Sequence, residues 1–472
     1  MPLIIFLASC ISSLIFALSF PPFNFWYFAF FGLTPLIFLS SKYNKLSYFI
    51  GFIAGLSFYI FLLNWLFAVS GFFYILLCVY LAIYWGIFFY LSSLYNFNPF
   101  VCASIWFFIE ILIENLLTGF PWLSFSLSQS TNHYIWKLPQ IIGSKGISFF
   151  LILSNFTIFC LFQKKFKVFL ISFFVFIISF TLLFFYNPEI KQKGKLKIMI
   201  IQPGIKTEKI KESETIINIL WEMTTKNVKK LKPDVVILPE GSFPDDIFSR
   251  PEILKKIKLL CENYKFSLIF GTFRSNNNKY YNSALFLKNG KIEFYDKTHL
   301  VPYGEFILGG RWEFIKKIFV NYAGYTPEIE RGKEIKNFNY KEIKIAPLIC
   351  YENIFPEITN KMLESGSNIF VVITNDSWFG NSFGPYQHFY HNVLRALETG
   401  RYFIQCGLSG ISGIVSEKGE VLKIIDIDKK ETLFFEVPLF FQKTIYGKYS
   451  DFPLSILSLL IIGGYLCRKL KK

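Results

Sequence analysis

The chain has 472 residues, of which 53% are hydrophobic, 20% aromatic and only 17% charged, a composition that does not fit a soluble protein. It excludes a disordered chain and a collagen-like fibre, and eight cysteines are too few for a disulfide-stabilised scaffold. The net charge of +16 is unevenly spread, because only nine charged residues lie in the first 188 positions. We therefore predict a transmembrane bundle over residues 1–188, a water-soluble domain over 189–451, and a C-terminal transmembrane helix with a basic tail over 452–472.

Apolar runs separated by Pro, Gly, Asn or Lys predict eight membrane-spanning helices, since a span needs about 20 apolar residues. The first run has no basic segment before it and no small-residue cleavage site after it, so we interpret it as a retained span. The predicted spans cover residues 3–20, 26–40, 48–69, 71–95, 99–117, 147–162, 168–186 and 452–466.

The Lys and Arg residues of the short loops predict the orientation of these spans. With the N-terminus in the cytoplasm, only Lys137 and Lys145 lie in short external loops. The cytoplasmic side then receives Lys42, Lys45, Lys164, Lys165, Lys167, Arg468, Lys469, Lys471 and Lys472. The polar region is therefore expected outside the cytoplasm. Because long domains are exported regardless of their charge, the positive charge does not indicate a nucleic-acid partner.

Two acidic residues, Glu110 and Glu114, lie four positions apart in the fifth predicted span. A carboxylate inside a membrane is costly, so it is a functional candidate by default. Two interpretations stay open: either both acids serve a function inside the bundle, or Glu114 lies near the outer interface and only Glu110 is deep. Trp122 and Trp136 follow this span and are expected in an aromatic belt at the outer interface.

The polar region alternates strands with helices, which predicts a layered α/β domain with buried sheets. The predicted strands cover residues 196–202, 235–238, 267–272, 343–350, 369–374 and 403–407, the helices cover 214–231 and 251–264, and hairpins turn at Asn289-Gly290 and Lys418-Gly419. Its cysteines are Cys261, Cys350 and Cys406, and an odd number predicts that at least one thiol stays free. We expect no metal site, and we interpret His388 and His391 as a solvated helix face.

Three short passages each place a reactive side chain at the end of a predicted strand: Glu240 in VVILPEG, Lys297 in FYDKTHLVPYGEF and Cys350 in APLICYEN. A thiol attacks as its thiolate, so Cys350 needs a nearby base and a nearby positive charge. Glu240 can serve as the base. The Lys297 ammonium and the backbone N–H of Tyr351 can stabilise the oxyanion that forms on an acyl carbon.

Taken singly, each of these residues is weak evidence, because a Cys that ends an apolar strand is usually a packed core residue. The ordered set of Glu, Lys and Cys resembles the nitrilase, or carbon-nitrogen hydrolase, superfamily. That resemblance implies an α-β-β-α sandwich with these three residues as its catalytic triad.

Together with the predicted spans, the chain resembles the apolipoprotein N-acyltransferase family. Further matching stretches are LLTGFPWLSFSLSQ (116–129), IIQPG (200–204), TNDSWFG (374–380), GPYQHF (384–389) and RALETGR (395–401). The resemblance implies that Glu240 is the base, Lys297 the oxyanion stabiliser and Cys350 the nucleophile. Glu305 would hold the lysine in place, and Glu352 would line the site.

The same resemblance implies a two-step acyl transfer. A phospholipid donates an acyl chain to the cysteine, which passes it to the α-amino group of a diacylglyceryl-modified N-terminal cysteine of an apolipoprotein. It implies a monomer without metal or cofactor in the lipid bilayer of the bacterial inner membrane, with the catalytic domain on the periplasmic side. Two stretches depart from the family pattern. Lys209-Ile210 stand where a Trp is usual, and QCGLSG (405–410) stands where the family commonly has an Arg followed by an Asn-rich turn.

Two other classes of function compete with this interpretation. One is a membrane-tethered amidase of the nitrilase type that releases its acyl group to water, and the other is a transporter or scaffold whose exported domain only binds. The complete triad argues against the second class. An apolar rim that would suit lipid chains argues against the first, and it consists of Trp378, Phe379, Phe383 and Phe389.

Overall fold

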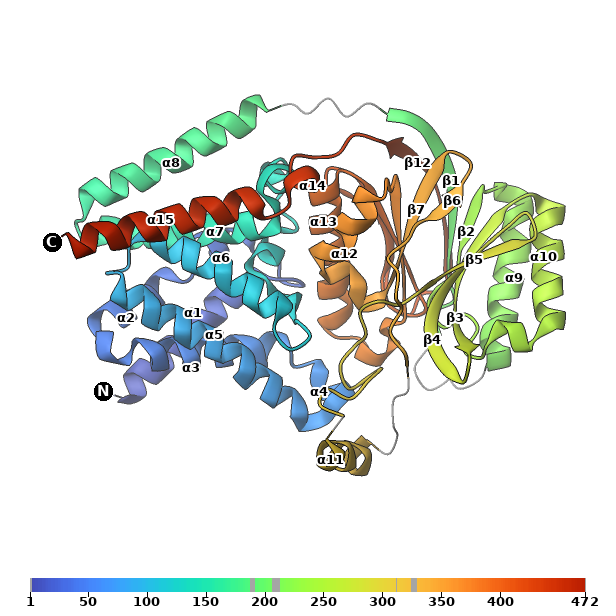
Figure 1. Ribbon diagram of the computed structural model, residues 1–472, viewed down its shortest axis with the longest axis horizontal. Helices are drawn as coiled ribbons and strands as arrows, with labels where there is room; N and C mark the ends of the chain where they lie inside the picture. The colour runs from blue at the N-terminus through green and yellow to red at the C-terminus, as the bar shows by residue number, and fades with distance from the viewer. Residues whose placement is uncertain (1, 187–191, 206–212, 311, 324–328, 472) are drawn as a thin grey trace. The chain divides into compact units, whose positions relative to one another are not determined.

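The computed structural model describes residues 2–186, 192–205, 213–310, 312–323 and 329–471 (Figure 1). The chain divides into two compact units. The membrane unit contains Met1–Glu189, Ser382–Thr399 and Lys443–Lys472, and the sandwich unit contains Ile190–Asn381 and Gly400–Gln442. The predicted boundary at 188/189 and the departure at Lys209-Ile210 lie outside the described residues, so the three-part domain division stays a prediction.

All the regular secondary structure in the described residues of the membrane unit is helical. Its α-helices are α1 (Pro2–Ala17), α2 (Thr34–Lys42), α3 (Ser47–Leu62), α4 (Leu66–Ser70), α5 (Tyr74–Leu94), α6 (Pro99–Asn115), α7 (Leu138–Phe162), α8 (Phe166–Phe185), α13 (Gly384–Thr399), α14 (Tyr446–Tyr449) and α15 (Phe452–Leu470). Short 3₁₀ helices join them: η1 (Trp26–Phe30), η2 (Asn44–Leu46), η3 (Gly71–Phe73), η4 (Pro121–Leu123), η5 (Phe125–Gln129) and η6 (His133–Ile135).

Five helical segments of the described chain are long and apolar enough to cross a membrane. They are Asn44–Leu62, Leu66–Leu94, Leu138–Phe162, Phe166–Phe185 and Phe452–Leu470. The polytopic membrane character that the sequence predicted is therefore confirmed, whereas the number of eight spans is not. Helices α1 and α6 have 16 and 17 residues and fall below the length of these five.

Three of the predicted spans have clearly different bounds in the structure. The helix of the predicted span at 48–69 ends at Leu62, and residues 66–70 form the separate helix α4. Residues 26–40 do not form one helix, because the chain turns between η1 and α2, and Pro35 lies in the first turn of a new helix of only nine residues. The predicted span at 147–162 begins earlier, at Leu138, with a kink at Gly143. Lys145 is thus part of α7 and not of an external loop.

The two intramembrane acids both have partners inside the membrane unit. Glu110 is 5% exposed, and its Oε1 accepts hydrogen bonds from Trp106 Nε1, Ser124 Oγ and the backbone N–H of Phe125. Glu114 forms an ion pair with Lys145 Nζ at 2.6 Å, and the same ammonium lies 2.8 Å from Asp451. A buried pair of this kind is costly to break because one charge would remain without a partner.

The sandwich unit contains two six-stranded sheets. One has the strand order β12-β1-β2-β3-β4-β5 and the other β11-β10-β9-β8-β7-β6. The strands are β1 (Gln192–Gln202), β2 (Val235–Ile237), β3 (Ser267–Asn276), β4 (Lys279–Lys288), β5 (Lys291–Asp296), β6 (Phe338–Tyr340), β7 (Ile343–Ile349), β8 (Ile369–Thr374), β9 (Tyr402–Gly407), β10 (Ser412–Val415), β11 (Val421–Ile425) and β12 (Glu431–Phe440). Its helices are α9 (Ser213–Leu231), α10 (Pro251–Tyr264), α11 (Glu313–Ala323) and α12 (Pro356–Glu364), with η8 (Ile247–Ser249), η9 (Cys350–Ile354) and η10 (Asp376–Phe379).

Helices α9 and α10 cover the first sheet (Figure 1). Both are amphipathic, and their apolar residues, among them Ile216, Leu220 and Ile257, are buried in one core with the strands. Each helix connects two parallel strands, α9 between β1 and β2 and α10 between β2 and β3. Figure 1 shows α12 on the opposite side of the two sheets from α9 and α10, which completes an α-β-β-α arrangement.

Candidate active site

All three predicted triad residues lie just after the ends of strands. Lys297 and Cys350 directly follow β5 and β7, and Glu240 follows β2 by three residues. Residues that follow strand ends are held by a rigid sheet, which is a common position for catalytic side chains.

The Lys297 ammonium is the best defined group of the site. It is 1% exposed and lies between two carboxylates, with Nζ at 2.9 Å from Glu305 Oε2 and 3.9 Å from Glu240 Oε1. Burial alone would lower its pKa, but the negative charges of Glu305 and Glu240 outweigh burial and raise the pKa above its ordinary value. Lys297 is therefore positively charged at neutral pH, and Glu305 is its nearest carboxylate.

Glu240 is a buried carboxylate that accepts hydrogen bonds with both oxygens. Its Oε1 accepts from Asn282 Nδ2 at 2.7 Å, and its Oε2 accepts from the backbone N–H of Asn375 at 2.8 Å. Burial raises its pKa, while Lys297 and these hydrogen bonds oppose the rise. A carboxylate with a raised pKa is a better proton acceptor near neutral pH, which suits a general base.

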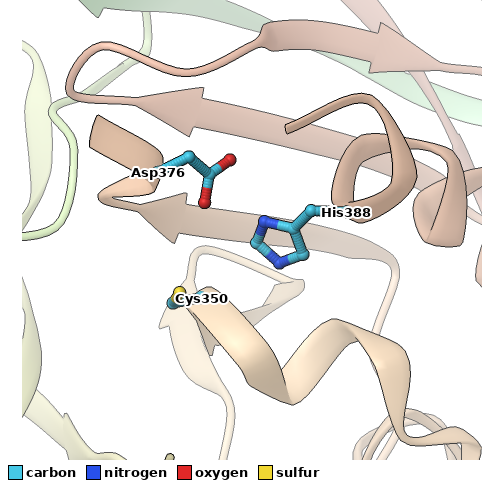
Figure 2. A group of neighbouring side chains, drawn as sticks. All are labelled: Cys350, Asp376 and His388. Atoms are coloured by element: carbon cyan, nitrogen blue, oxygen red, sulfur yellow. The ribbon is translucent and has the colours of Figure 1, made fainter. Parts of the chain in front are cut away.

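Cys350 occupies a strained backbone position where β7 passes into η9. Its φ of +51° lies in the left-handed region that side chains other than glycine rarely adopt, and such strain concentrates at functional sites. Figure 2 shows the thiol together with the Asp376 carboxylate, and the Cys350 Sγ and an Asp376 oxygen lie within 4.8 Å.

The thiol of Cys350 has a strongly raised pKa. Burial is the main cause, the Glu240 and Asp376 carboxylates raise the pKa further, and the Lys297 ammonium opposes them. The resting thiol is therefore protonated at neutral pH, so an attack on an acyl carbon requires a base to remove its proton.

Glu352, which we expected to line the site, is completely buried, and its carboxylate accepts five hydrogen bonds. These bonds hold the backbone around the site in place. The donors are Tyr295 Oη, Thr298 N, Thr298 Oγ1, His299 N and Ile349 N. These bonds join the segment after Lys297 to the residue before Cys350. Tyr351 is buried beside the rings of His299 and Phe355.

Two residues of the site were missed in the sequence. Asn282 on β4 donates hydrogen bonds to both Glu240 and Glu305, and Asn375 contributes its backbone N–H. Asn375 lies inside the TNDSWFG stretch, so the match of that stretch to the family pattern could have pointed to this residue. Nothing local marks Asn282, because its role depends on the pairing of β4 with β5.

The predicted apolar rim is only partly a surface feature. Trp378 is 56% exposed and Phe379 is half-buried. Phe383 belongs to the membrane unit, where its ring packs on Phe23 at 5.3 Å and on Phe61 at 6.2 Å. Phe389 is completely buried in α13, so it is not part of a rim.

The interpretation of α13 as a solvated helix was wrong. His388 and His391 are both buried, and both contact Trp122, His388 by ring stacking and His391 Nε2 by a hydrogen bond of 2.9 Å with the Trp122 carbonyl. Trp122 itself is 2% exposed and so does not belong to a lipid-facing belt. The third residue labelled in Figure 2, His388, is thus part of the membrane unit. All eight cysteines are free, which includes the thiol expected to be free.

The comparisons with known proteins agree with these features. Residues 12–157 match the apolipoprotein N-acyltransferase N-terminal domain, and residues 200–440 match the carbon-nitrogen hydrolase family. An apolipoprotein N-acyltransferase of Wigglesworthia glossinidia brevipalpis is 31% identical over 96% of this chain and 96% of its own. The chain belongs to the apolipoprotein N-acyltransferase family. A second member, from Geobacter metallireducens, is 27% identical over 94% of this chain and 92% of its own.

Membership of this family makes the chain an N-acyltransferase, and the carbon-nitrogen hydrolase match confirms the nitrilase-like fold of the sandwich unit. Among solved structures, a carbon-nitrogen hydrolase superfamily protein of Xanthomonas campestris is 14% identical with a TM-score of 0.41. It covers 56% of this chain and 97% of its own.

Proposed function

We propose that this chain takes an acyl chain from a phospholipid onto Cys350 and passes it to the α-amino group of diacylglyceryl-cysteine in an apolipoprotein. One observation carries the proposal: in a member of the N-acyltransferase family, a buried ammonium, Lys297, lies between two carboxylates, and its charge lowers the pKa of the Cys350 thiol. Lys297 is the oxyanion stabiliser, Glu240 is the base, and Cys350 is the nucleophile.

The first step acylates the enzyme. Glu240 takes the thiol proton while Cys350 Sγ attacks the ester carbonyl of the phospholipid. The negative oxygen that forms is stabilised by the Lys297 ammonium and the Tyr351 N–H, and each such donor contributes about 2.7–4 kcal/mol. The ester C–O bond then breaks, and Glu240 returns its proton to the oxygen of the leaving lysophospholipid.

The second step transfers the acyl chain to nitrogen. The neutral amine of the acceptor attacks the thioester, and Glu240 takes a proton from the nitrogen as the amide forms. The C–S bond breaks, and the proton returns from Glu240 to the Cys350 thiolate. Glu305 keeps Lys297 in place during both steps, and Glu352 fixes the segment before Cys350.

The site's surroundings suit lipid substrates. We propose that the exposed Trp378 and its neighbour Phe379 in the sandwich unit contact acyl chains, and that within the membrane unit Phe383 does so too. We propose an inner-membrane protein that is active as a monomer. The distribution of Lys and Arg in the short loops supports an orientation with the sandwich unit on the periplasmic side. Since Lys145 is buried in α7, only Lys137 remains as an external loop lysine, which strengthens the asymmetry.

The experiment that tests the proposal separates acylation of Cys350 from transfer of the acyl group to the acceptor. Purified full-length protein is mixed with phospholipid vesicles, and the intact mass and the released lysophospholipid are measured. We expect one acyl group per enzyme on Cys350 and about one lysophospholipid, as ping-pong chemistry requires. A diacylglyceryl-cysteine peptide added afterwards should remove the acyl group as an amide.

The matched pair of variants is Cys350→Ala and Cys406→Ala. Both remove a thiol at or near the end of a strand of the same sheet, but Cys406 donates only to the backbone carbonyls of Ile201 and Ile237. We expect acylation to vanish in the first and to persist in the second. Continuous release of free fatty acid without the peptide would support the amidase-type alternative instead.

A further inference from the structure

Helix α13 has an unusual place in the chain. It lies between η10 and β9, which both belong to the sandwich unit, yet its own residues belong to the membrane unit. Two sequence stretches that the proposed chemistry does not use, TGFPW and GPYQH, meet here. The residues that join them are Trp122 and Gln387.

The side-chain amide of Gln387 is fully buried and uses its whole hydrogen-bonding capacity. Its Oε1 accepts from the indole N–H of Trp65 at 3.0 Å and from that of Trp122 at 2.8 Å. Its Nε2 donates to the carbonyl of Leu62 at 3.0 Å and to that of Pro21 at 3.5 Å. One amide thus connects α13 to four separate points of the N-terminal bundle.

The far end of α13 is attached in the same way. The Glu398 carboxylate accepts a hydrogen bond of 2.7 Å from the backbone N–H of Ser144 in α7, and Arg395 Nη2 lies 3.1 Å from Ser144 Oγ. The helix is therefore attached to the membrane bundle at both its first and its last turn. The Gln387 amide, which is buried with all its partners present, defines one arrangement, since any shift leaves donors unpaired.

Short chain segments connect α13 to elements of the sandwich unit. Only Gly400 and Arg401 separate α13 from β9, and Arg401 is buried with its guanidinium bound to the carbonyls of Ser367, Gly400 and Gln442. At the other end, eight residues separate Gly384 from Asn375, whose N–H donates a hydrogen bond to Glu240.

We propose that Gln387 is a positioning residue that makes Cys350 acylation by bilayer lipids efficient. By binding Trp65 and Trp122 it fixes α13 on the membrane bundle, and α13 is the segment of that bundle that continues directly toward β9 of the sandwich unit. Gln387 does not touch the reacting atoms. The inference rests on the proposed function, because it assumes that the acyl donor lies in the bilayer.

The test compares two acyl donors on the full-length protein in vesicles: a phospholipid of the vesicle and the water-soluble ester p-nitrophenyl butyrate. With the ester, Cys350 Sγ bonds to the butyryl carbon, the C–O bond breaks and p-nitrophenolate leaves. For Gln387→Met we expect acylation by phospholipid to fall about 100-fold, the loss typical of a 1 Å misplacement. Acylation by the soluble ester should change less than threefold, because it needs no alignment with the bilayer.

The matched control is Asn155→Leu. Asn155 is also a completely buried amide of the membrane unit with bonds to Leu33 N, Ala29 O and Leu151 O, but with none to α13. The Asn155→Leu variant should leave the ratio of acylation by phospholipid to acylation by the soluble ester unchanged. If Gln387→Met does not fold, as judged by thermal unfolding, Trp122→Phe is measured instead, since it removes one N–H and keeps an aromatic ring.

The outcomes are distinguishable. An equal loss with both donors, or no loss with phospholipid, would overturn the role of Gln387. Failure of the unmodified protein to be acylated by phospholipid would instead overturn the proposed function.

Discussion

The side-chain amide of Asn282 donates hydrogen bonds to both Glu240 and Glu305, at 2.7 and 2.9 Å. It therefore connects the proposed base to the carboxylate that holds Lys297. All three groups are anchored on neighbouring strand ends or loops of one sheet, so a change at Asn282 reaches the proton acceptor without touching Cys350.

Replacing Asn282 by Leu should shift the pH dependence of acylation. The hydrogen bond from Asn282 lowers the pKa of Glu240, so its removal raises that pKa. Glu240 acts only when deprotonated, so the loss of activity on the acid side should begin at a higher pH than in the unmodified protein. The check is the rate of Cys350 acylation measured by mass spectrometry across pH. An acid limb that stays in place, or moves to lower pH, contradicts the assignment of Glu240 as the base.

Lys297→Met should abolish most of the acylation while the protein remains folded. The loss of one preorganised oxyanion donor costs about 10²–10³ in rate. The matched control is Lys344→Met, because Lys344 is an exposed lysine on β7 that binds only the Ser365 carbonyl. The measurement is the rate of lysophospholipid release. Near-normal release by Lys297→Met would show that Lys297 is not the oxyanion stabiliser.

The features that could be predicted from the sequence are those that a local pattern of residues marks. The turn at Asn289-Gly290 forms as expected, with both residues at positive φ, and α10 has the bounds that its Pro and its amphipathic pattern predicted. The three reactive residues were found because each follows a predicted strand within a recognisable motif: LPEG, KTHLVPYGE and CYE. Their catalytic roles remain a prediction.

Features that depend on distant pairing were not predicted. Strand β12 contains Pro438 and pairs with β1 across more than 200 residues, so no local pattern marks it. Asn375 acts through its backbone, which is independent of residue type. Trp122 was expected at a lipid interface because tryptophans are common there, whereas its N–H has a buried partner, Gln387, that lies far along the chain.

Labelling tests the predicted orientation. A Cys introduced at Asn277, in the exposed turn between β3 and β4, should react with an impermeant thiol reagent added to intact spheroplasts. The natural Cys467, exposed near the end of α15, should react only after lysis. The reverse pattern would contradict a periplasmic sandwich unit.

Glu352→Gln should act mainly by lowering the free energy of unfolding and not by a direct effect on the acyl-transfer reaction. The carboxylate accepts five hydrogen bonds, and an amide nitrogen in its place would face donors. Bonds to charged groups contribute about 1.5–3 kcal/mol each, so we expect a loss of about 3 kcal/mol in the free energy of unfolding. Thermal unfolding measures this, with the exposed Glu364→Gln on α12 as control. Equal stability of the two variants would show that the buried network is not needed.

Alkylation of Cys350 by iodoacetamide tests the charges around the thiol independently of any lipid. The Glu240 carboxylate raises the pKa of Cys350 and the Lys297 ammonium lowers it. Glu240→Gln should therefore lower the thiol's pKa and speed alkylation at neutral pH, whereas Lys297→Met should raise the pKa and slow it. Both variants should nevertheless lose acylation by phospholipid, since one lacks the base and the other the oxyanion donor. Cys261, whose pKa burial raises to about 12, serves as the unreactive internal reference. Shifts of alkylation in the same direction for both variants would show that the two charges do not act on the thiol as the structure indicates.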